Sequence, residues 1–384
     1  MPKARFGLKV IDCMQENLKT PNTELPDSLE TPDESVLDQF SWRRLIWPVL
    51  IAVAALAYAV YQMLQEGINP ITDVNWTSRV FGMIGLGFLC MFLRDFGYIW
   101  RMRLLTDQKL TWRSAIEVTL LWEFSSAVSP SIVGGSALAI FMLIKEKISA
   151  GRSTAIVFIT IFLDEVFYLA ILPVCLLVVN YADIFAPLEN ATSVFGTGMV
   201  VGFWIAYCIL FSYTTFLAFA LFIRPEATSR LLKRVFRTRL LKRWEEGGAR
   251  TADELLISSR EFRAKDFRYW FKAGLATCFA WFGRYLVVNC LLAAFAIGLG
   301  YGDHLVAFAR QAIMFVVMLI SPTPGSSGVA EEMFALMLRD YTEFIRLISV
   351  MWRGITYYPY LLLGVPLLPI WFRRVSRRSK SKAE

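Results

Sequence analysis

Residues 321–332, SPTPGSSGVAEE, interrupt a long apolar segment of the chain. QAIMFVVMLI (311–320) precedes them and MFALMLRDY (333–341) follows them. Proline lacks a backbone donor and disfavours helix in the residue before it, while glycine permits tight turns. Such irregular backbone survives at membrane depth only when it is buried in protein or lines a wet cavity. The stretch therefore predicts a helix break inside a membrane protein, at a point that also receives two carboxylates.

The composition indicates an integral membrane protein. The 384 residues are 56% hydrophobic and 15% aromatic, with a mean hydropathy of +0.49, and several runs approach the roughly 20 residues that span a bilayer. The net charge of +8 lies mostly beside apolar runs, which favours loops near an anionic leaflet over nucleic-acid binding. His304 is the only histidine, and no CxxC, Walker A or GxGxxG motif stands in a suitable context. We therefore expect no metal, no nucleotide and no other cofactor.

The distribution of Lys and Arg between loops predicts six membrane spans and two re-entrant hairpins, in an all-α polytopic fold. The predicted spans are 45–64, 80–100, 154–179, 195–223, 271–299 and 342–371. The broken segments 114–144 and 305–338 are predicted hairpins, the first entered from the cytosol and the second from outside. Both chain termini are then cytosolic.

This order of elements predicts an inverted repeat of the kind found in many transporters. Repeat one covers about 80–180 and repeat two about 271–372, joined across a basic cytosolic connector at about 224–270. The connector includes SRLLKRVFRTRLLKRW, either a basic helix on the membrane surface or a solvated link. The whole transmembrane domain covers 44–372, after a cytosolic arm at 1–43 and before a basic tail at 373–384.

The two hairpin tips share Ser-Pro-Ser/Thr followed by small residues, and each starts a half-helix. The free N–H groups at such a start suit a phosphate or carboxylate, although a purely structural tip remains the alternative. The substrate-binding candidates are Ser129, Pro130, Gly134, Gly135 and Ser136 in tip one, and Ser321, Pro322, Thr323, Pro324, Gly325, Ser326, Ser327, Gly328 and Glu331 in tip two.

Charged residues inside the apolar segments form a second group of candidates. An ionised side chain at the bilayer centre costs about 2.5–3.5 kcal/mol on insertion scales, so these residues are expected to pair with one another or to act on a substrate. We expect Arg94 to reach the cytosolic edge instead, which makes Arg94 and Asp95 weaker candidates. The predicted charge network consists of Glu123, Asp164, Glu165, Arg284, Glu332 and Arg353.

The motifs resemble those of the lysylphosphatidylglycerol synthase transmembrane-region family, a flippase-like domain. SPTPGSSGVAE resembles its Pro-Gly-Gly-x-Gly-x-x-Glu signature and SPSIVGGSALA its first Pro/Gly motif. WRMRLL (100–105) resembles the end of its second span, and RGITYYPYLLLG (353–364) its last span. Departures are LDEVFY, where Asp164 is followed by Glu165 without an arginine, and Ala139 at the position corresponding to Glu331. These departures put a cationic lipid substrate in doubt.

The resemblance implies an inner-membrane protein that moves a polar or aminoacylated phospholipid between leaflets. The soluble aminoacyl-transfer domain of well-known members is not expected here, so we predict no enzyme activity. Membrane lipids are the expected partners, homo-oligomers occur among relatives, and nucleic acid is not expected. The alternatives are a membrane-embedded lipid-modifying enzyme and a non-transporting assembly partner in the cell envelope.

Overall fold

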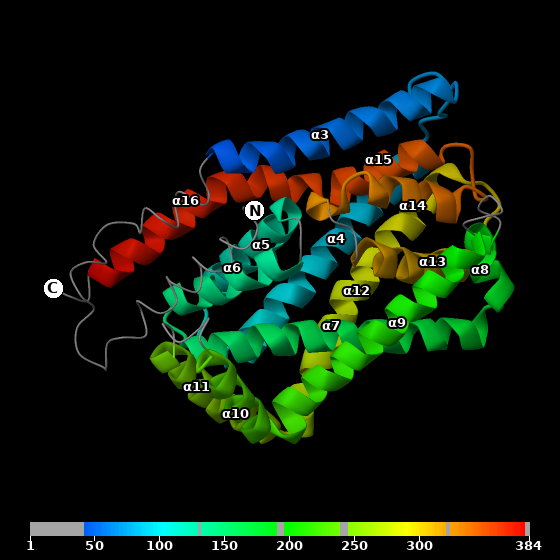
Figure 1. Cartoon of the computed structure of the whole chain (residues 1–384). Coiled ribbons are helices and arrows are strands. Elements are labelled where there is room, and N and C mark those ends of the chain that lie inside the picture. Colours follow the sequence, from blue (N-terminus) through cyan, green and yellow to red (C-terminus); the bar gives the residue numbers. More distant parts are fainter. Residues whose placement is uncertain (1–41, 130–131, 190–195, 239–244, 320–322, 381–384) are drawn as a thin grey trace.

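The computed structural model describes residues 42–129, 132–189, 196–238, 245–319 and 323–380, and these residues fold into an all-α assembly of long helices (Figure 1). The N-terminal arm at 1–41 and the last residues of the tail, 381–384, lie outside the described residues. Pro130, Ser321 and Pro322 also lie outside them, so the candidate roles of these three stay predictions. The predicted class, an all-α polytopic membrane protein, is confirmed.

Six helical stretches are long and apolar enough to cross a membrane, at the six predicted places. Five are α3 (Trp42–Gln65), α4 (Ser78–Leu105), α7 (Ala150–Val178), α9 (Gly196–Ala218, extended by a π-helical turn, Phe219–Ile223) and α12 (Phe267–Phe295). The sixth contains a break that the sequence analysis did not foresee. It consists of α15 (Ile345–Thr356) and α16 (Tyr358–Lys380), separated at Tyr357. Pro359 explains the break, because proline cannot donate a helical hydrogen bond and restricts the residue before it.

Both broken segments fold as pairs of packed helices. The first pair is α5 (Trp112–Val128) with α6 (Ile132–Lys145), and the second is α13 (Tyr301–Leu319) with α14 (Val329–Leu338) after a short 3-10 turn, Pro324–Ser326. These are called hairpin one and hairpin two below. That each hairpin enters and leaves the membrane on one side stays a prediction.

The centre of the molecule is the crossing of α4 and α12, which make the most extensive helix contact in the fold. Two glycines let the backbones approach. A Cβ on Gly97 would lie 2.6 Å from the carbonyl oxygen of Ala276, and a Cβ on Gly283 would lie 2.6 Å from that of Cys90. Because small residues at a crossing permit close packing of membrane helices, these glycines fix α4 and α12 as the frame of the fold.

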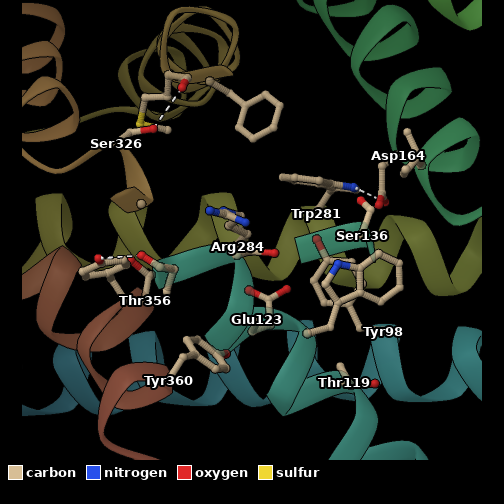
Figure 2. A pocket seen from close by; sticks show the side chains of 18 of the residues that line it. Tyr98, Thr119, Glu123, Ser136, Asp164, Trp281, Arg284, Ser326, Thr356 and Tyr360 are labelled. Carbon is tan, nitrogen blue, oxygen red and sulfur yellow. Dashed lines mark hydrogen bonds between the residues drawn. The ribbon is translucent and has the colours of Figure 1, made fainter. Parts of the chain in front are cut away.

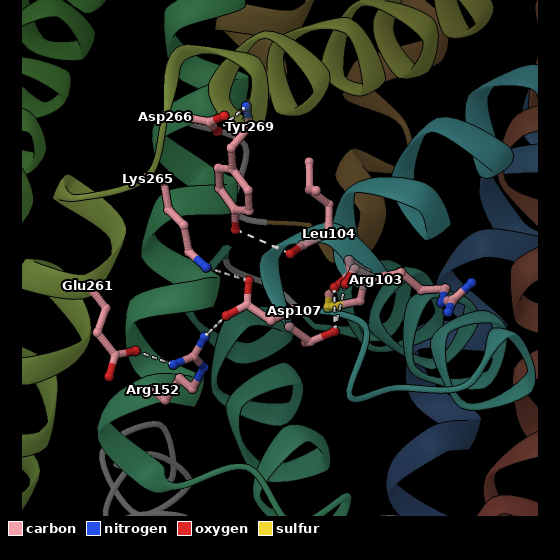
Figure 3. A network of polar contacts seen from close by, with 10 residues as sticks. Arg103, Leu104, Asp107, Arg152, Glu261, Lys265, Asp266 and Tyr269 are labelled. Atoms are coloured by element: carbon pink, nitrogen blue, oxygen red, sulfur yellow. Dashed lines mark hydrogen bonds and ion pairs between the residues drawn. The ribbon is translucent and has the colours of Figure 1, made fainter.

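The basic connector forms a third helical pair, α10 (Pro225–Phe236) and α11 (Glu245–Arg263), beyond one end of α7 and α9 (Figure 1). The stretch with two interpretations, a surface helix or a solvated link, begins in α10, and that choice stays open. α11 follows this stretch and packs on the start of α7. The carboxylate of Glu254 accepts the N–H of Gly151 at 2.9 Å. In Figure 3, Arg152 joins Glu261 to Asp107, which also accepts from Lys265 at 2.8 Å. Ion pairs thus tie the connector to the end of α4 and the start of α7.

The remaining helix, α8 (Tyr181–Glu189), lies at the other end of α7 and packs on α9, α13 and α14. Arg310 of α13, 5% exposed, fixes this contact. Its guanidinium donates to the carbonyl oxygens of Asp183 at 2.7 Å and of Met337 at 2.8 Å. One buried arginine therefore joins α8 to hairpin two.

Candidate functional site

A cavity of about 320 Å³ lies between the two hairpins and the crossing of α4 and α12 (Figure 2). α4, α5, α6, α7, α12, α13, the tip of hairpin two, α15 and α16 all contribute to its wall. Residues from both halves of the chain therefore face the same space. Of the predicted substrate-binding residues, five line the cavity, namely Ser129, Ser136, Thr323, Gly325 and Ser326.

The first charged group of the cavity wall is a bidentate pair between α4 and α7. Arg101, 2% exposed, donates to the two carboxylate oxygens of Asp164 at 2.6 and 2.9 Å. Thr277 accepts from the same guanidinium at 2.9 Å, and the indole N–H of Trp281 donates to Asp164 at 2.8 Å. Two parallel charge-assisted bonds fix both direction and distance, so this pair joins α4, α7 and α12 rigidly.

The second charged group joins α4 to hairpin one. Arg94 donates to Glu123 at 2.5 Å, to Asp95 at 2.9 Å and to the Tyr360 hydroxyl at 2.7 Å. Tyr360 in turn donates to Asp95 at 2.6 Å. The expectation that Arg94 extends to the cytosolic edge is wrong, because its side chain is 1% exposed and its charge is balanced by two internal carboxylates.

The third charged group fixes the tip of hairpin two. Arg353 of α15 donates to Glu331 at 2.7 Å, and Glu331 accepts the backbone N–H of Gly328 at 2.6 Å. Arg353 also donates to the carbonyl oxygen of Gly325 at 2.9 Å and to the Ser327 hydroxyl at 3.3 Å. Glu331 thus supplies the anion at the start of α14, and the Gly328 N–H is not free to hold a phosphate in this conformation. A role for Gly328 and Glu331 in substrate binding stays a prediction.

Glycine is needed at this tip for conformational reasons. Gly328 has φ +87° and Gly325 has φ +55°, a region that other residues adopt only with strain. A Cβ on Gly325 would also lie 2.2 Å from the ring of Tyr357. The geometry of Gly325 and Gly328 therefore accounts for the shape of the tip, and a binding role for Pro324, Gly325, Ser327 and Gly328 stays a prediction.

The remaining predicted residues occupy distinct places. Glu332 points away from the cavity and pairs with Arg346 at 2.8 Å, with its side chain 48% exposed. Gly135 is buried across hairpin one from Ser126, whose hydroxyl would lie 2.3 Å from an added Cβ. Gly134 lies within α6. Glu165 and Arg284, by contrast, both line the cavity.

Sequence reasoning missed Arg101, which lies just after the predicted span 80–100 and was not among the candidates. It also missed the aromatic wall of the cavity, which includes Tyr98, Trp281, Tyr357 and Tyr360. One signal was available. Arg94, Tyr98 and Arg101 recur at helical spacing i, i+4 and i+7, so they share one face of α4.

Comparison with known proteins agrees with the architecture. Residues 45–364 match the family described as the lysylphosphatidylglycerol synthase TM region. A UPF0104 membrane protein of Archaeoglobus fulgidus is 26% identical over 331 residues, which cover 82% of this chain and 93% of that protein. The family match spans most of the chain, including both hairpins, the α4–α12 crossing and every charged pair that faces the cavity. The resemblance read from the motifs is thereby confirmed, and this multi-pass membrane protein belongs to the lysylphosphatidylglycerol synthase transmembrane-region family.

Proposed function

We propose that the protein moves a polar lipid between the two leaflets of the bacterial cytoplasmic membrane and carries out no covalent chemistry. The observation that carries this proposal is the cavity, which places charged and hydroxyl side chains from both repeats in the interior of a membrane protein. Buried ionisable residues in membrane helices characteristically mark substrate or ion pathways. A lipid head group would enter this polar space while its acyl chains stay in the bilayer.

The two hairpin tips supply the parts that would open. Each tip interrupts a helix beside the cavity, and the two belong to repeats of opposite predicted orientation. Alternating access in repeat-built transporters is largely a rocking of one repeat against the other around a fixed site. Here the α4–α12 crossing would be the fixed frame, and hairpins one and two would gate opposite leaflets. With both termini cytosolic, hairpin one would gate the inner leaflet.

The test is lipid exchange in liposomes that contain the purified protein and fluorescent lipids. The fraction of label that a membrane-impermeant quencher reaches is followed over time, with and without an imposed proton gradient. Ser136→Phe fills the cavity from α6, and Ile116→Phe, on the exposed face of α5, is the matched control. We expect exchange to fall at least about tenfold in Ser136→Phe and to be unchanged in Ile116→Phe.

Two results would contradict the proposal in different ways. If the wild-type protein accelerates exchange of no lipid under either condition, the function is wrong. If Ser136→Phe elutes as the wild type does in size-exclusion chromatography and still exchanges lipid at the wild-type rate, the cavity is not the path.

A further inference from the structure

Arg284 differs from the other arginines that line the cavity or contact its lining residues. Arg94, Arg101 and Arg353 each form an ion pair with at least one carboxylate. Arg284 lies in the middle third of α12, lines the cavity and makes no ion pair or hydrogen bond with the residues that the structure describes. Its guanidinium carbon lies 5.3 Å from the centroid of the Trp281 ring, over which it is placed. Figure 2 shows the side chain among the labelled cavity residues.

A guanidinium at this depth is unfavourable unless an anion accompanies it. Three of the nearby carboxylates, Glu123, Asp164 and Glu331, are engaged by the neighbouring arginines, and Arg284 forms an ion pair with none of them. Phe315 stands where an acid could have paired with Arg284. It lines the cavity six positions before Ser321, where hairpin one has Glu123 six positions before Ser129. Hairpin two therefore lacks a counterpart of Glu123, the acid of hairpin one that neutralises Arg94 of α4.

Glu165 is the complementary case. Its side chain is on α7, it is 9% exposed and it lines the same cavity. One carboxylate oxygen, Oε2, is fully buried and accepts no hydrogen bond from the described residues. The adjacent Asp164 is already held by Arg101 and Trp281. Glu165 thus presents an uncommitted carboxylate, where buried polar groups are normally satisfied.

Three hydroxyls in the wall are also uncommitted. Thr119 Oγ1 on α5 and Thr160 Oγ1 and Tyr168 Oη on α7 are buried, line the cavity and have no partner among the described residues. One cation, one carboxylate and three hydroxyls are therefore available to a ligand. A ligand that satisfies them carries one anionic group, one donor cation and hydrogen-bonding oxygens.

We infer that the cavity binds a net-neutral head group with one phosphodiester and one primary ammonium. The phosphodiester contacts Arg284 and the ammonium contacts Glu165. A head group with a second ammonium would leave that charge unpaired, because the other carboxylates of the wall are held by arginines. A quaternary ammonium would place no N–H on Glu165 or the threonines. That the ligand is a lipid rests on the proposed function.

Binding to the purified full-length protein in detergent tests the inference without requiring transport. The ligands are short-chain phosphatidylethanolamine, phosphatidylglycerol, phosphatidylcholine and lysylphosphatidylglycerol, with water-soluble glycerophosphoethanolamine as the lipid-free form of the same head group. Ligand-dependent shifts of the thermal midpoint give the apparent affinities. We expect phosphatidylethanolamine to bind at least about tenfold more tightly than each other lipid.

Two substitutions assign the ends of the ligand. Glu165→Gln should reduce phosphatidylethanolamine affinity to that of phosphatidylglycerol and leave phosphatidylglycerol unchanged, whereas Arg284→Gln should weaken both. Glu343→Gln and Arg268→Gln are the matched controls, because both change exposed residues outside the cavity. These two variants should bind each lipid as the wild type does. The inference is overturned if both cavity variants bind phosphatidylethanolamine as the wild type does, or if lysylphosphatidylglycerol or phosphatidylglycerol binds as tightly.

The failure of this inference and that of the proposed function give different results. Wild-type exchange of lipids without preference for phosphatidylethanolamine would overturn the inference and leave the function. Selective binding of phosphatidylethanolamine without any lipid exchange would overturn the function and leave the site. If glycerophosphoethanolamine binds as tightly as the lipid, the site recognises a free solute, which contradicts the lipid ligand.

Discussion

Hairpins one and two share a sequence motif at the tip, yet they balance charge differently. Hairpin two carries its acid, Glu331, ten residues after Ser321, where it caps α14 and pairs with Arg353. Hairpin one carries Ala139 at that position and places its acid, Glu123, six residues before Ser129, where it pairs with Arg94. The same break in a membrane helix can therefore be stabilised at the tip itself or along the preceding helix.

The difference is also one of redundancy. Arg94 contacts two carboxylates and a tyrosine hydroxyl, so it loses only part of its environment when one partner is removed. Arg353 contacts Glu331 as its only carboxylate in the described part of the chain. Hairpin two should therefore be the more sensitive of the two to a single change, and the following predictions test that order.

The largest effect is expected for Glu331→Gln. The change leaves the Arg353 guanidinium buried without a counter-charge, which typically costs about 3 kcal/mol or more. We expect a loss of about 3 kcal/mol in the free energy of unfolding, measured by equilibrium unfolding in mixed micelles. The double variant Glu331→Leu with Arg353→Met should recover most of it, because paired apolar replacement of a buried ion pair is often nearly neutral. No recovery would mean that the loss comes from the α14 cap.

Gly325→Ala should follow, with a loss of about 2 kcal/mol. It forces a side chain into a left-handed backbone conformation, which costs about 1–2 kcal/mol, and presses on the Tyr357 ring. The matched change in hairpin one is Gly135→Ala, in a helical backbone, where the added Cβ would lie 2.3 Å from the Ser126 hydroxyl and 3.2 Å from the Cα and Cβ of Ser126. We expect that variant to lose less, about 1 kcal/mol, on the scale of a modest overpacking. Equal losses would show that the two tips are equally constrained.

Glu123→Gln should cost about 1 kcal/mol, the scale of one lost hydrogen bond, because Arg94 keeps Asp95 and Tyr360. Asp95→Asn added to it should then cost clearly more than either change alone, since Arg94 loses its last carboxylate. Unfolding of the two single variants and the double variant measures this non-additivity. If Glu123→Gln alone lowers the free energy of unfolding as much as Glu331→Gln does, the remaining partners of Arg94 do not compensate for the loss of Glu123.

These comparisons also show what the sequence could and could not predict. The spans and both helical breaks follow from composition, because twenty apolar residues or a Pro/Gly cluster have local consequences. The partners of the charges do not. Asp164 pairs with Arg101, 63 positions away, and Glu123 pairs with Arg94, which the sequence analysis treated as a weaker candidate. Such pairs depend on which helices cross. The close contact of α4 and α12 at Gly97 and Gly283 joins residues far apart in the sequence, so local sequence patterns do not predict it.

Arg353 and Arg284 illustrate the same limit within one class of residue. Both are arginines inside apolar segments of repeat two, and sequence reasoning treated them alike. In the fold, Arg353 faces the tip of hairpin two and forms an ion pair with Glu331. Arg284 faces the cavity, where the corresponding acid is replaced by Phe315. A structural and a candidate binding arginine can thus be told apart only when their neighbours are placed.

The smallest effect is expected where the two hairpins meet. The Tyr357 hydroxyl donates to the carbonyl oxygen of Ala127 in hairpin one at 3.1 Å and accepts from the Ser327 hydroxyl in hairpin two at 3.5 Å. Tyr357→Phe removes both bonds and keeps the ring, so we expect a loss of about 1 kcal/mol or less in the free energy of unfolding.

The same variant distinguishes a static contact from a functional one. If the hairpins gate opposite leaflets, their relative motion must break the bond to Ala127, and removing it should alter the rate of lipid exchange at nearly constant stability. Ser327→Ala is the matched control, because it removes the longer bond of Tyr357 and the bond from Arg353 to Ser327 but leaves the link to hairpin one. A rate that changes in Tyr357→Phe and not in Ser327→Ala would assign the effect to that link. Equal rates in both variants and the wild type would show that the tips do not move apart at Tyr357, and the gates would then have to open elsewhere along α6 or α14.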